Sequence, residues 1–402
     1  MLGLRHQLPV YSPLPARALL GSLLGRPGVQ AAALTAELTD RYGADRVVLC
    51  GSGAQALQLA LAGAGVEEVA LPAFTCYEVA SAAVGAGVRV RLYDVDPDTL
   101  APELSSLEEA LRAGAGAVVV APLYGVPVAW AGVEALAAAH GALLVEDAAQ
   151  GHGASWRGKP LGSVGEVSII SLGRGKGWTG AAGGALLLRR SGTRLRAHPQ
   201  VGRLARAAAP GGLRPLLVAA AQWSVGRASL YRLPLMVPGL GLGETHYHPP
   251  GELAGMPARS AALARATRAP AEAEAELRRE NALWLLAALD RAGVRPIRLP
   301  PGAVGGYLRL PVRLPRGLAS FPSPERALRL GVGRSYPGTL ADLPELAPHL
   351  LAGKACPGAR RLVRELVTLP THTRVSARER GELARLLAAI APGERAGERA
   401  AR

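Results

Sequence analysis

The sequence predicts an α/β protein built on a largely parallel sheet that is covered by helices on both faces. The first observation is that short apolar runs alternate with segments of helical spacing from residue 46 onward. The second is that glycine-rich or polar turns separate the two kinds of segment, as after the run RVVLC. Such alternation is typical of parallel strands joined by crossover helices. The 402 residues are 49% hydrophobic, which is enough for a substantial core.

The elements follow a helical segment at residues 29–42. We expect strands at the apolar runs, at residues 46–50, 69–71, 88–93, 117–121, 142–145 and from 168 onward. We expect helices between them, at residues 54–62, 78–84, 103–112 and 133–140. In the C-terminal part we expect one long helix or two broken helices at 258–289, and strands at 307–312 and 331–335. A last helix is expected to begin at the capping box of Ser376 and Glu379 and to end at residue 390.

The charge of the chain is strongly positive, but its distribution does not favour nucleic acid as a partner. The formal net charge is +15, yet the arginines are scattered from Arg5 to Arg402 with few aromatic residues among them. The three cysteines are an odd number without paired spacing, which argues against a disulfide framework and a structural zinc site. His246 and His248 have no third ligand in sight, so we expect no metal. A reducing, cytoplasmic location fits this composition.

We expect neither a signal peptide nor stable insertion into a membrane. Prolines interrupt the N-terminal segment, and prolines and glycine also break the uncharged stretch 113–133. A membrane span needs about 20 mostly apolar residues in one helix. The apolar stretch 213–238 has two interpretations: a helix and loop that pack over the mouth of a site, which we favour, or an amphipathic helix at a lipid surface. Peripheral membrane association therefore stays open.

Three of the predicted strands are followed by or end in residues that are suited to ligand binding or catalysis. A glycine turn, Gly51-Ser52-Gly53, follows the first strand and opens a helix, which is an arrangement suited to a phosphate. Asp147 ends a later strand, and Lys176 follows the next in a glycine-rich turn. Ligands of parallel sheets bind at the carboxyl ends of the strands, so we expect these groups to converge. A dinucleotide site is disfavoured because the second strand ends in proline and alanine where an acidic residue is needed.

Lys176 is conspicuous because lysine is rare in this chain. Lysine and arginine together number 46, and the lysines are Lys159, Lys176 and Lys354. Arginine supplies charge but does not lose its proton, whereas lysine can become a nucleophile toward a carbonyl compound. We therefore interpret Lys176 as a residue that binds an aldehyde cofactor covalently.

A series of motifs leads to a family. In order they are SGAQALQLAL, LPAFTCYEVASAAVGAG, VRLYDVDPDTL, LYGVP and VEDAAQGHGASWRGKPLGSVGEVSIISLGRGKGWTGAAGGALLL. This combination resembles the DegT/StrS family of pyridoxal-phosphate-dependent sugar aminotransferases, continuously from about residue 47 to 188. A weaker likeness continues in Ser335-Tyr336-Pro337 and in VTLPTHTRVS.

The resemblance implies a fold and a set of roles. The fold would be the aspartate-aminotransferase-like fold type I, with a mostly parallel seven-stranded sheet in a large domain and a smaller C-terminal α/β domain. Lys176 would bind pyridoxal 5′-phosphate covalently and move the proton, and Asp147 would pair with the ring nitrogen. The other implied cofactor contacts are Gln150 at the phenolic oxygen, Gly53, Ala54 and Ser171 at the phosphate, and Cys76 or Tyr77 over the ring.

The resemblance also implies partners and a reaction. A homodimer would place each active site at the subunit interface, and an amino acid, by analogy glutamate, would donate its amino group. The acceptor would be a keto group of a nucleotide-activated sugar or a related polyol, in glycan or natural-product biosynthesis. Two alternatives are another pyridoxal-phosphate enzyme that acts on a non-sugar substrate, and a non-catalytic binding protein with the same fold.

Several residues depart from the family pattern and bear on the substrate. The run after the lysine is Ala181-Ala182-Gly183-Gly184 where the family has GEGG, and Pro122 stands where a histidine usually precedes LYG. The segment 251–263 lacks the asparagine that usually reaches the neighbouring subunit's phosphate. We expect an N-terminal arm at 1–30, a large cofactor-binding domain at 31–257 with an inserted region at 190–250, and a small domain at 258–402.

Overall fold

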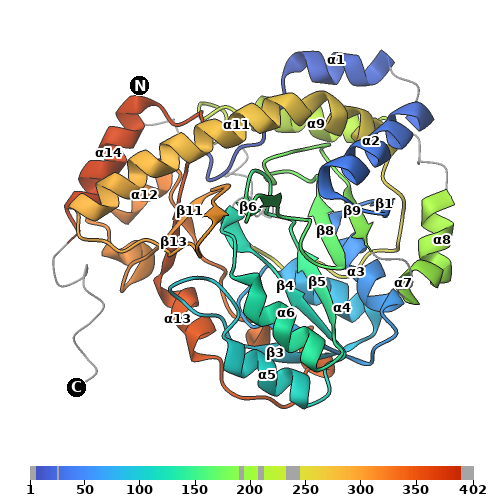
Figure 1. The fold of residues 1–402 in the computed structure, drawn as a ribbon. Helices are drawn as coiled ribbons and strands as arrows, with labels where there is room; N and C mark the ends of the chain where they lie inside the picture. The colour runs from blue at the N-terminus through green and yellow to red at the C-terminus, as the bar shows by residue number, and fades with distance from the viewer. Residues whose placement is uncertain (1–5, 25–26, 190–193, 207–211, 232–244, 391–402) are drawn as a thin grey trace.

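The structure is a computed structural model that describes residues 6–24, 27–189, 194–206, 212–231 and 245–390 (Figure 1). The C-terminal residues from 392 onward, which are polar in sequence, lie outside the described part, as do stretches of the expected insertion at 190–250.

A seven-stranded sheet forms the centre of the fold, with the strand order β1-β9-β8-β5-β4-β2-β3. Its strands are β1 Arg46–Cys50, β2 Glu68–Pro72, β3 Arg89–Tyr93, β4 Ala117–Val120, β5 Leu143–Asp147, β8 Val167–Ser171 and β9 Gly184–Leu188. Neighbours from β3 through β8 pair in parallel, whereas β9 is antiparallel to both β1 and β8. The expected mostly parallel sheet is therefore confirmed, with β9 as its exception.

Two small antiparallel sheets accompany the large one. The first joins β6 Ser155–Trp156, β7 Lys159–Pro160 and β10 Ala303–Val304, and the second joins β11 Leu310–Arg313, β12 Gly333–Arg334 and β13 Leu366–Leu369. The later strands are shorter than the runs expected at 307–312 and 331–335, because pairing covers residues 310–313 and 333–334 alone.

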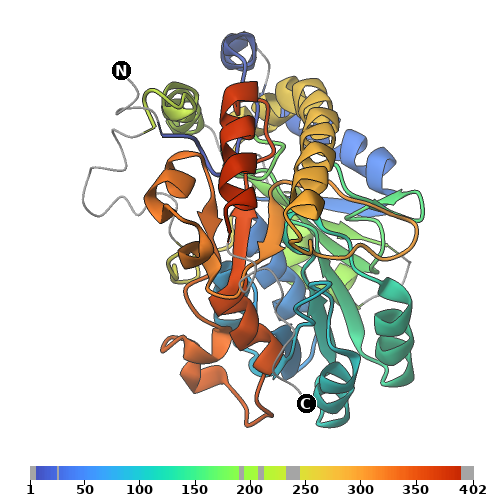
Figure 2. The same ribbon diagram turned by 90° about the vertical axis from the view of Figure 1, so that its left-hand side faces the viewer.

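Helices cover both faces of the large sheet (Figures 1 and 2). On one face, α3 Gly53–Gly63, α4 Tyr77–Ala86 and α8 Pro199–Arg206 share a core with strand residues such as Val119 and Val145. On the other face, α5 Leu104–Arg112 and α6 Trp130–Ala139 pack on residues such as Val118 and Val120. Because adjacent strand residues point to opposite faces, a strand buried on both sides reads as one apolar run.

The longest helix, α11 Ala258–Arg291, belongs to two cores and runs along the top of Figure 1. Its first half packs Ala261 and Ala264 against α2 Pro27–Tyr42, while its second half packs Leu285 and Leu289 with the sheet of β11 and β13. The helix continues through Pro270, so the long-helix expectation is correct and the broken one is wrong. The division into an arm, a large domain and a small domain at residue 258 remains a prediction.

The remaining helices are short. They are α1 Ala16–Leu24, α7 Arg194–Ala197, α9 Arg214–Val225, α12 Pro324–Arg329, α13 Pro357–Glu365 and α14 Ala377–Ala388, with the 3-10 turns η1 Leu123–Gly125, η2 Gly317–Ser320, η3 Leu340–Asp342 and η4 Ala347–His349. Helix α9 contacts α1 and α11, and its Leu216 and Val218 pack against the cluster of Leu14 and Leu263. Among the described helices, none combines the length and the apolar character that a membrane crossing needs.

Candidate active site

A cavity of about 1050 Å³ opens at the carboxyl ends of the parallel strands. Residues within three positions after β1, β2, β4 and β5, and the last residue of β8, contribute to its wall, as the rule for α/β sheets predicts. All the residues predicted for the site line this cavity except Tyr77: Gly53, Ala54, Cys76, Asp147, Gln150, Ser171 and Lys176. We call it the large cavity.

The N-terminus of α3 meets the end of β8 on one side of the large cavity. Ser52 caps the helix, because its Oγ accepts a hydrogen bond of 3.1 Å from the Gln55 N–H. The N–H groups of Gly53 and Ala54, in the first turn of the helix, have no partner within the helix and form part of its positive end. A Cβ on Gly53 would lie 2.9 Å from the Cβ of Ser171, so glycine is required for this close approach. The result is a cradle of backbone donors and one hydroxyl that suits a phosphate.

The last two residues of β5 are adjacent carboxylates with different surroundings. Glu146 is fully buried, and its carboxylate accepts hydrogen bonds from Gly162 N at 2.7 Å, Val164 N at 2.9 Å and Ser168 Oγ at 2.9 Å. Asp147 faces the large cavity, where Oδ1 accepts one bond of 3.1 Å from the Ala149 N–H. Burial raises the pKa of Asp147, and the Ala149 N–H and the charge of Lys176 oppose that rise.

Lys176 stands in a turn between two glycines with left-handed backbones. The φ angles are +70° at Gly175 and +82° at Gly177, where a side chain would be strained. A Cβ on Gly177 would also lie 3.0 Å from Nη1 of Arg278, which is buried beneath the turn. Burial raises the pKa of both Cys76 and Asp147, and the charge of Lys176 opposes that rise at each group.

The start of α4 separates the two candidates for the residue over the cofactor ring. Cys76 is the extended residue before the helix and lines the large cavity. Tyr77 is the first helical residue, and its side chain packs in the core with Leu340 and Leu343, with its hydroxyl beside Gly338. Of the two, Cys76 lines the large cavity and Tyr77 does not, and the residue that covers the cofactor ring stays a prediction.

Two tyrosines that the sequence analysis assigned no role join the site through Gln150. The Gln150 Oε1 accepts a bond of 2.9 Å from the Tyr124 N–H, and its Nε2 donates one of 3.1 Å to the Tyr336 hydroxyl. The rings of Tyr124 and Tyr336 stack with 6.2 Å between their centroids. The LYG and SYP motifs that contain them were the available signal. One N–H of the Gln150 amide is left to donate to a ligand.

The segment before α1 lines the large cavity and links it to the C-terminal elements. Ser12 is buried, and its Oγ accepts a hydrogen bond of 3.0 Å from the Gly177 N–H beside Lys176. The Leu8 carbonyl lies 2.8 Å from Nε2 of buried His372, and Gln7 donates a bond of 2.7 Å to the Arg374 carbonyl. This segment therefore supports the turn that carries Lys176 and connects it to the C-terminal elements.

The residues that depart from the family pattern also lie around the site. Ala181 has a φ of +65° at the position where the family has glycine, so its backbone carries left-handed strain. Pro122 lines the large cavity. The segment at 251–256 lies beside the end of β1 of the same chain, where the Gly51 N–H donates a hydrogen bond of 2.8 Å to the Ala254 carbonyl.

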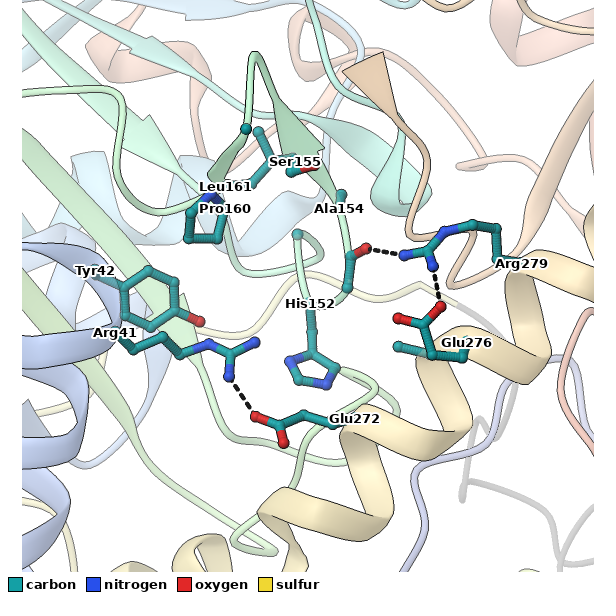
Figure 3. Close-up of a pocket in the computed structure, with 14 residues that line it drawn as sticks. Arg41, Tyr42, His152, Ala154, Ser155, Pro160, Leu161, Glu272, Glu276 and Arg279 are labelled. Carbon is teal, nitrogen blue, oxygen red and sulfur yellow. Dashed lines mark hydrogen bonds and ion pairs between the residues drawn. The ribbon is translucent and has the colours of Figure 1, made fainter. Parts of the chain in front are cut away.

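A second, smaller cavity of about 230 Å³ lies between α2, the hairpin of β6 and β7, and α11 (Figure 3). Arg41 pairs with Glu272 there, and Arg279 pairs with Glu276 and donates a bond of 3.0 Å to the Gly153 carbonyl. His152 lines the cavity, and burial together with Arg278 and Arg41 lowers its pKa to about 3. We call this the small cavity; none of the predicted site residues lines it.

The large cavity fits pyridoxal phosphate as the resemblance implies. The phosphate cradle, the Asp147 carboxylate and Lys176 are separate groups that line the same cavity, and each keeps capacity for a ligand. The arrangement could hold a phosphate, stabilise a protonated ring nitrogen and form a covalent bond from an amine.

Comparisons with known proteins find similarity to aminotransferases over part of the chain. Residues 16–197 match the model of the DegT/DnrJ/EryC1/StrS aminotransferase family. An L-glutamine:2-deoxy-scyllo-inosose aminotransferase of Streptoalloteichus tenebrarius is 38% identical over 148 residues, 36% of this chain and 35% of that protein. A UDP-N-acetyl-3-dehydro-alpha-D-glucosamine 3-aminotransferase of Acidithiobacillus ferrooxidans is 34% identical over 164 residues, 40% of this chain and 44% of that protein. The matched stretch thus spans less than half the length of these relatives.

The likeness in fold covers more of the chain. The crystal structure of AtS13 from Actinomadura melliaura superposes with a TM-score of 0.73 at 22% identity, over 96% of this chain and 99% of that one. The fold is therefore the type I fold of aminotransferases, including the C-terminal elements that the sequence match does not reach.

Proposed function

We propose, on the premise that residues 16–197 belong to the DegT/DnrJ/EryC1/StrS aminotransferase family, that this protein is a pyridoxal-phosphate-dependent transaminase. It would take an amino group from an amino acid, with glutamate expected, and transfer it to a keto group of a nucleotide-activated sugar or a related polyol. The observation that carries the proposal is that Lys176, Asp147 and the phosphate cradle line one cavity.

Each residue has a distinct task in this reaction. Gly53, Ala54 and Ser171 would hold the phosphate, and Lys176 would bind the cofactor through Nζ and then accept and return the proton at the substrate carbon. The Asp147 carboxylate would hold a proton on the ring nitrogen. Pyridoxal phosphate, when bound, supplies an electron sink for the negative charge that develops on that carbon.

Charge supports anionic substrates. The cations that line the large cavity are Arg174, Lys176, Arg309, Arg334 and Arg374, and the carboxylates are Glu78 and Asp147. Both an amino acid and a sugar nucleotide carry acidic groups that such a wall attracts. We further propose a homodimer with the active site at the subunit interface, which sedimentation or light scattering would test.

The test is spectroscopic. The purified protein, incubated with pyridoxal phosphate, should show the visible absorbance of a lysine-bound cofactor, and L-glutamate or L-glutamine should convert it to the amine form. After borohydride reduction, mass spectrometry should locate the cofactor on Lys176. Lys176→Ala should lose the band, while Lys159→Ala is the matched control because Lys159 is exposed and lies outside the large cavity.

The outcomes separate the alternatives. Absence of a bound cofactor in the natural protein would refute the proposal. A bound cofactor that neither amino acid converts would favour a different pyridoxal-phosphate reaction. Conversion without turnover of any keto-sugar nucleotide or keto-polyol would leave the first half of the reaction in place and refute the assigned acceptor.

A further inference from the structure

Arg278, in the second half of α11, is a fully buried cation. Its Nε donates a hydrogen bond of 3.3 Å to the Gly306 carbonyl, and its Nη2 donates one of 3.2 Å to the His152 carbonyl. Burial lowers the pKa of the guanidinium to about 10, so it still carries its charge at neutral pH. A charge in the interior destabilises a fold unless it is well paired. The presence of this one therefore points to a role beyond packing.

The protein compensates the charge of Arg278 only in part. Glu274, one helical turn earlier, accepts hydrogen bonds of 2.9 Å from the Thr373 N–H and 2.7 Å from the Thr373 hydroxyl, so its carboxylate oxygens face Thr373. Within the described residues, Nη1 of Arg278 has no hydrogen-bond partner. Buried polar groups nearly always have one, so the surroundings of Nη1 need an explanation.

Nη1 lies against the turn that carries Lys176. We call residues 173–177 the lysine turn. A Cβ on Gly177 would lie 3.0 Å from Nη1 and 3.2 Å from Nη2 of Arg278, so the bare backbone of Gly177 packs directly on the end of the guanidinium. The residue that follows Lys176 in the chain is thus fixed by a contact from α11, while Lys176 itself lines the large cavity.

The same helix contacts the chain just beyond the lysine turn at two further points. Trp178 Nε1 donates a hydrogen bond of 2.7 Å to the Ala264 carbonyl, and the Thr267 hydroxyl donates one of 2.6 Å to the Thr179 carbonyl. At 3.6 residues per turn, positions 264, 267 and 278 fall on one face of α11. Arg278 therefore belongs to a row of contacts that joins α11 to the lysine turn and the residues after it.

The next residue, Arg279, makes bonds of the same kind but is directed into the small cavity (Figure 3). Its Nη2 donates a hydrogen bond of 3.0 Å to the Gly153 carbonyl, and its Nε donates one of 3.4 Å to the Gly305 carbonyl. These carbonyls are the direct neighbours of the two that Arg278 binds. Both arginines thus tie the same two loops to α11, and what Arg278 adds is the contact with the lysine turn.

We propose that Arg278 is a positioning residue that holds the lysine turn in the geometry in which Lys176 reaches the substrate carbon. The inference rests on the proposed transaminase function, in which Lys176 accepts and returns a proton. Proton transfer needs a precise geometry, so a small shift of the turn lowers the rate while binding of the amino acid stays intact. A planar guanidinium suits this task because it binds two carbonyls and covers Gly177 at the same time.

The first measurement uses the protein without cofactor. Hydrogen exchange, followed by mass spectrometry of peptides that contain residues 173–177, reports how readily the lysine turn opens. Arg278→Met should speed this exchange about tenfold, because hydrogen bonds from a charged group are lost. Arg279→Met is the matched control: it removes bonds to the same two loops and should leave exchange of the lysine turn unchanged.

The second measurement uses the cofactor-loaded enzyme. Conversion of the cofactor band, by whichever of L-glutamate and L-glutamine the natural protein uses, gives a maximal rate and a half-saturating concentration. Arg278→Met should lower the rate about 100-fold and change the half-saturating concentration little. Arg279→Met should change neither. Arg278→Lys keeps the charge without the planar fork, so it should recover part of the rate.

Melting temperatures show which variants are folded, and if Arg278→Met is not, Arg278→Lys replaces it in both measurements. Equal effects of the Arg278 and Arg279 substitutions, an unchanged rate, or a loss confined to the half-saturating concentration would overturn the inference while the transaminase function stands. A natural protein that takes up no pyridoxal phosphate refutes the transaminase function, whereas hydrogen exchange still reports whether Arg278 holds the lysine turn.

Discussion

The two cavities of this protein are both lined by charged residues but arrange them differently. In the small cavity each arginine has a carboxylate partner, Glu272 for Arg41 and Glu276 for Arg279. In the large cavity, Arg309 has no ion pair in the described chain, and Asp147 accepts a single hydrogen bond. The charges of the first kind, in the small cavity, pair with one another and stabilise contacts between elements. The charges of the second kind, in the large cavity, have few partners in the protein and can bind a ligand. Groups of the second kind reduce stability and mark the functional site.

The largest expected effect is at Asp147. Asp147→Ala should lower turnover at least about 100-fold, because the ring nitrogen loses the carboxylate that keeps it protonated. Steady-state transamination assays on cofactor-loaded protein measure this. The matched change in the small cavity, Glu272→Ala, should leave turnover unchanged. If both substitutions lowered turnover equally, the distinction between the two cavities would fail.

The next effect is a pH dependence at the small cavity. His152 has its pKa lowered to about 3 in the folded protein, whereas an unfolded histidine titrates near 6.5. Below about pH 6.5 the unfolded state binds a proton that the folded state does not. The free energy of unfolding therefore falls as the pH is lowered, by about 1.4 kcal/mol at pH 5.5. His152→Phe removes this term. Urea unfolding at pH 7.5 and 5.5 should show a smaller loss in the variant; equal losses would contradict the lowered pKa.

A smaller effect concerns backbone strain in the wall of the large cavity. Ala181 has a φ of +65°, a conformation that costs an alanine more than a glycine. Ala181→Gly should raise the free energy of unfolding by up to about 1 kcal/mol. Ala182→Gly, next to it, serves as the control, since Ala182 lacks a positive φ. Destabilisation by the Ala181 change would show that its methyl group contributes more than the strain removes.

The smallest effect is the ion pair between Arg41 and Glu272. Both side chains are partly exposed, at 27% and 43%, so solvent screens their attraction. A double-mutant cycle with Arg41→Gln and Glu272→Gln should give a coupling of about 0.5 kcal/mol. A coupling several times larger would mean that the small cavity is far less hydrated than its exposure indicates.

Much of this site followed from the sequence because strand ends are visible in it. Gly53, Asp147 and Ser171 each stand at the carboxyl end of an apolar run, and parallel strands bring such ends to one edge. The antiparallel direction of β9 was not visible, since a strand buried on both faces reads the same in either direction.

Other features depended on distant packing or on the phase of a helix. Tyr77 and Cys76 are neighbours, and which one faces the large cavity depends on where α4 begins. Arg309 belongs to the C-terminal elements and reaches the wall of the large cavity only through the tertiary fold. Neither residue type nor local spacing indicated that this arginine, among so many, would be half-buried without a partner.

The segment that holds the lysine turn has a consequence for how the protein is made. Leu8 and Gln7 are synthesised early, but their partners His372 and Arg374 follow 364 and 367 residues later. Ser12 bonds beside Lys176 from the same segment. Contacts so distant in sequence form late in folding. The lysine turn therefore acquires its final support only when almost the whole chain has left the ribosome, and a shortened translation product lacks a completed site.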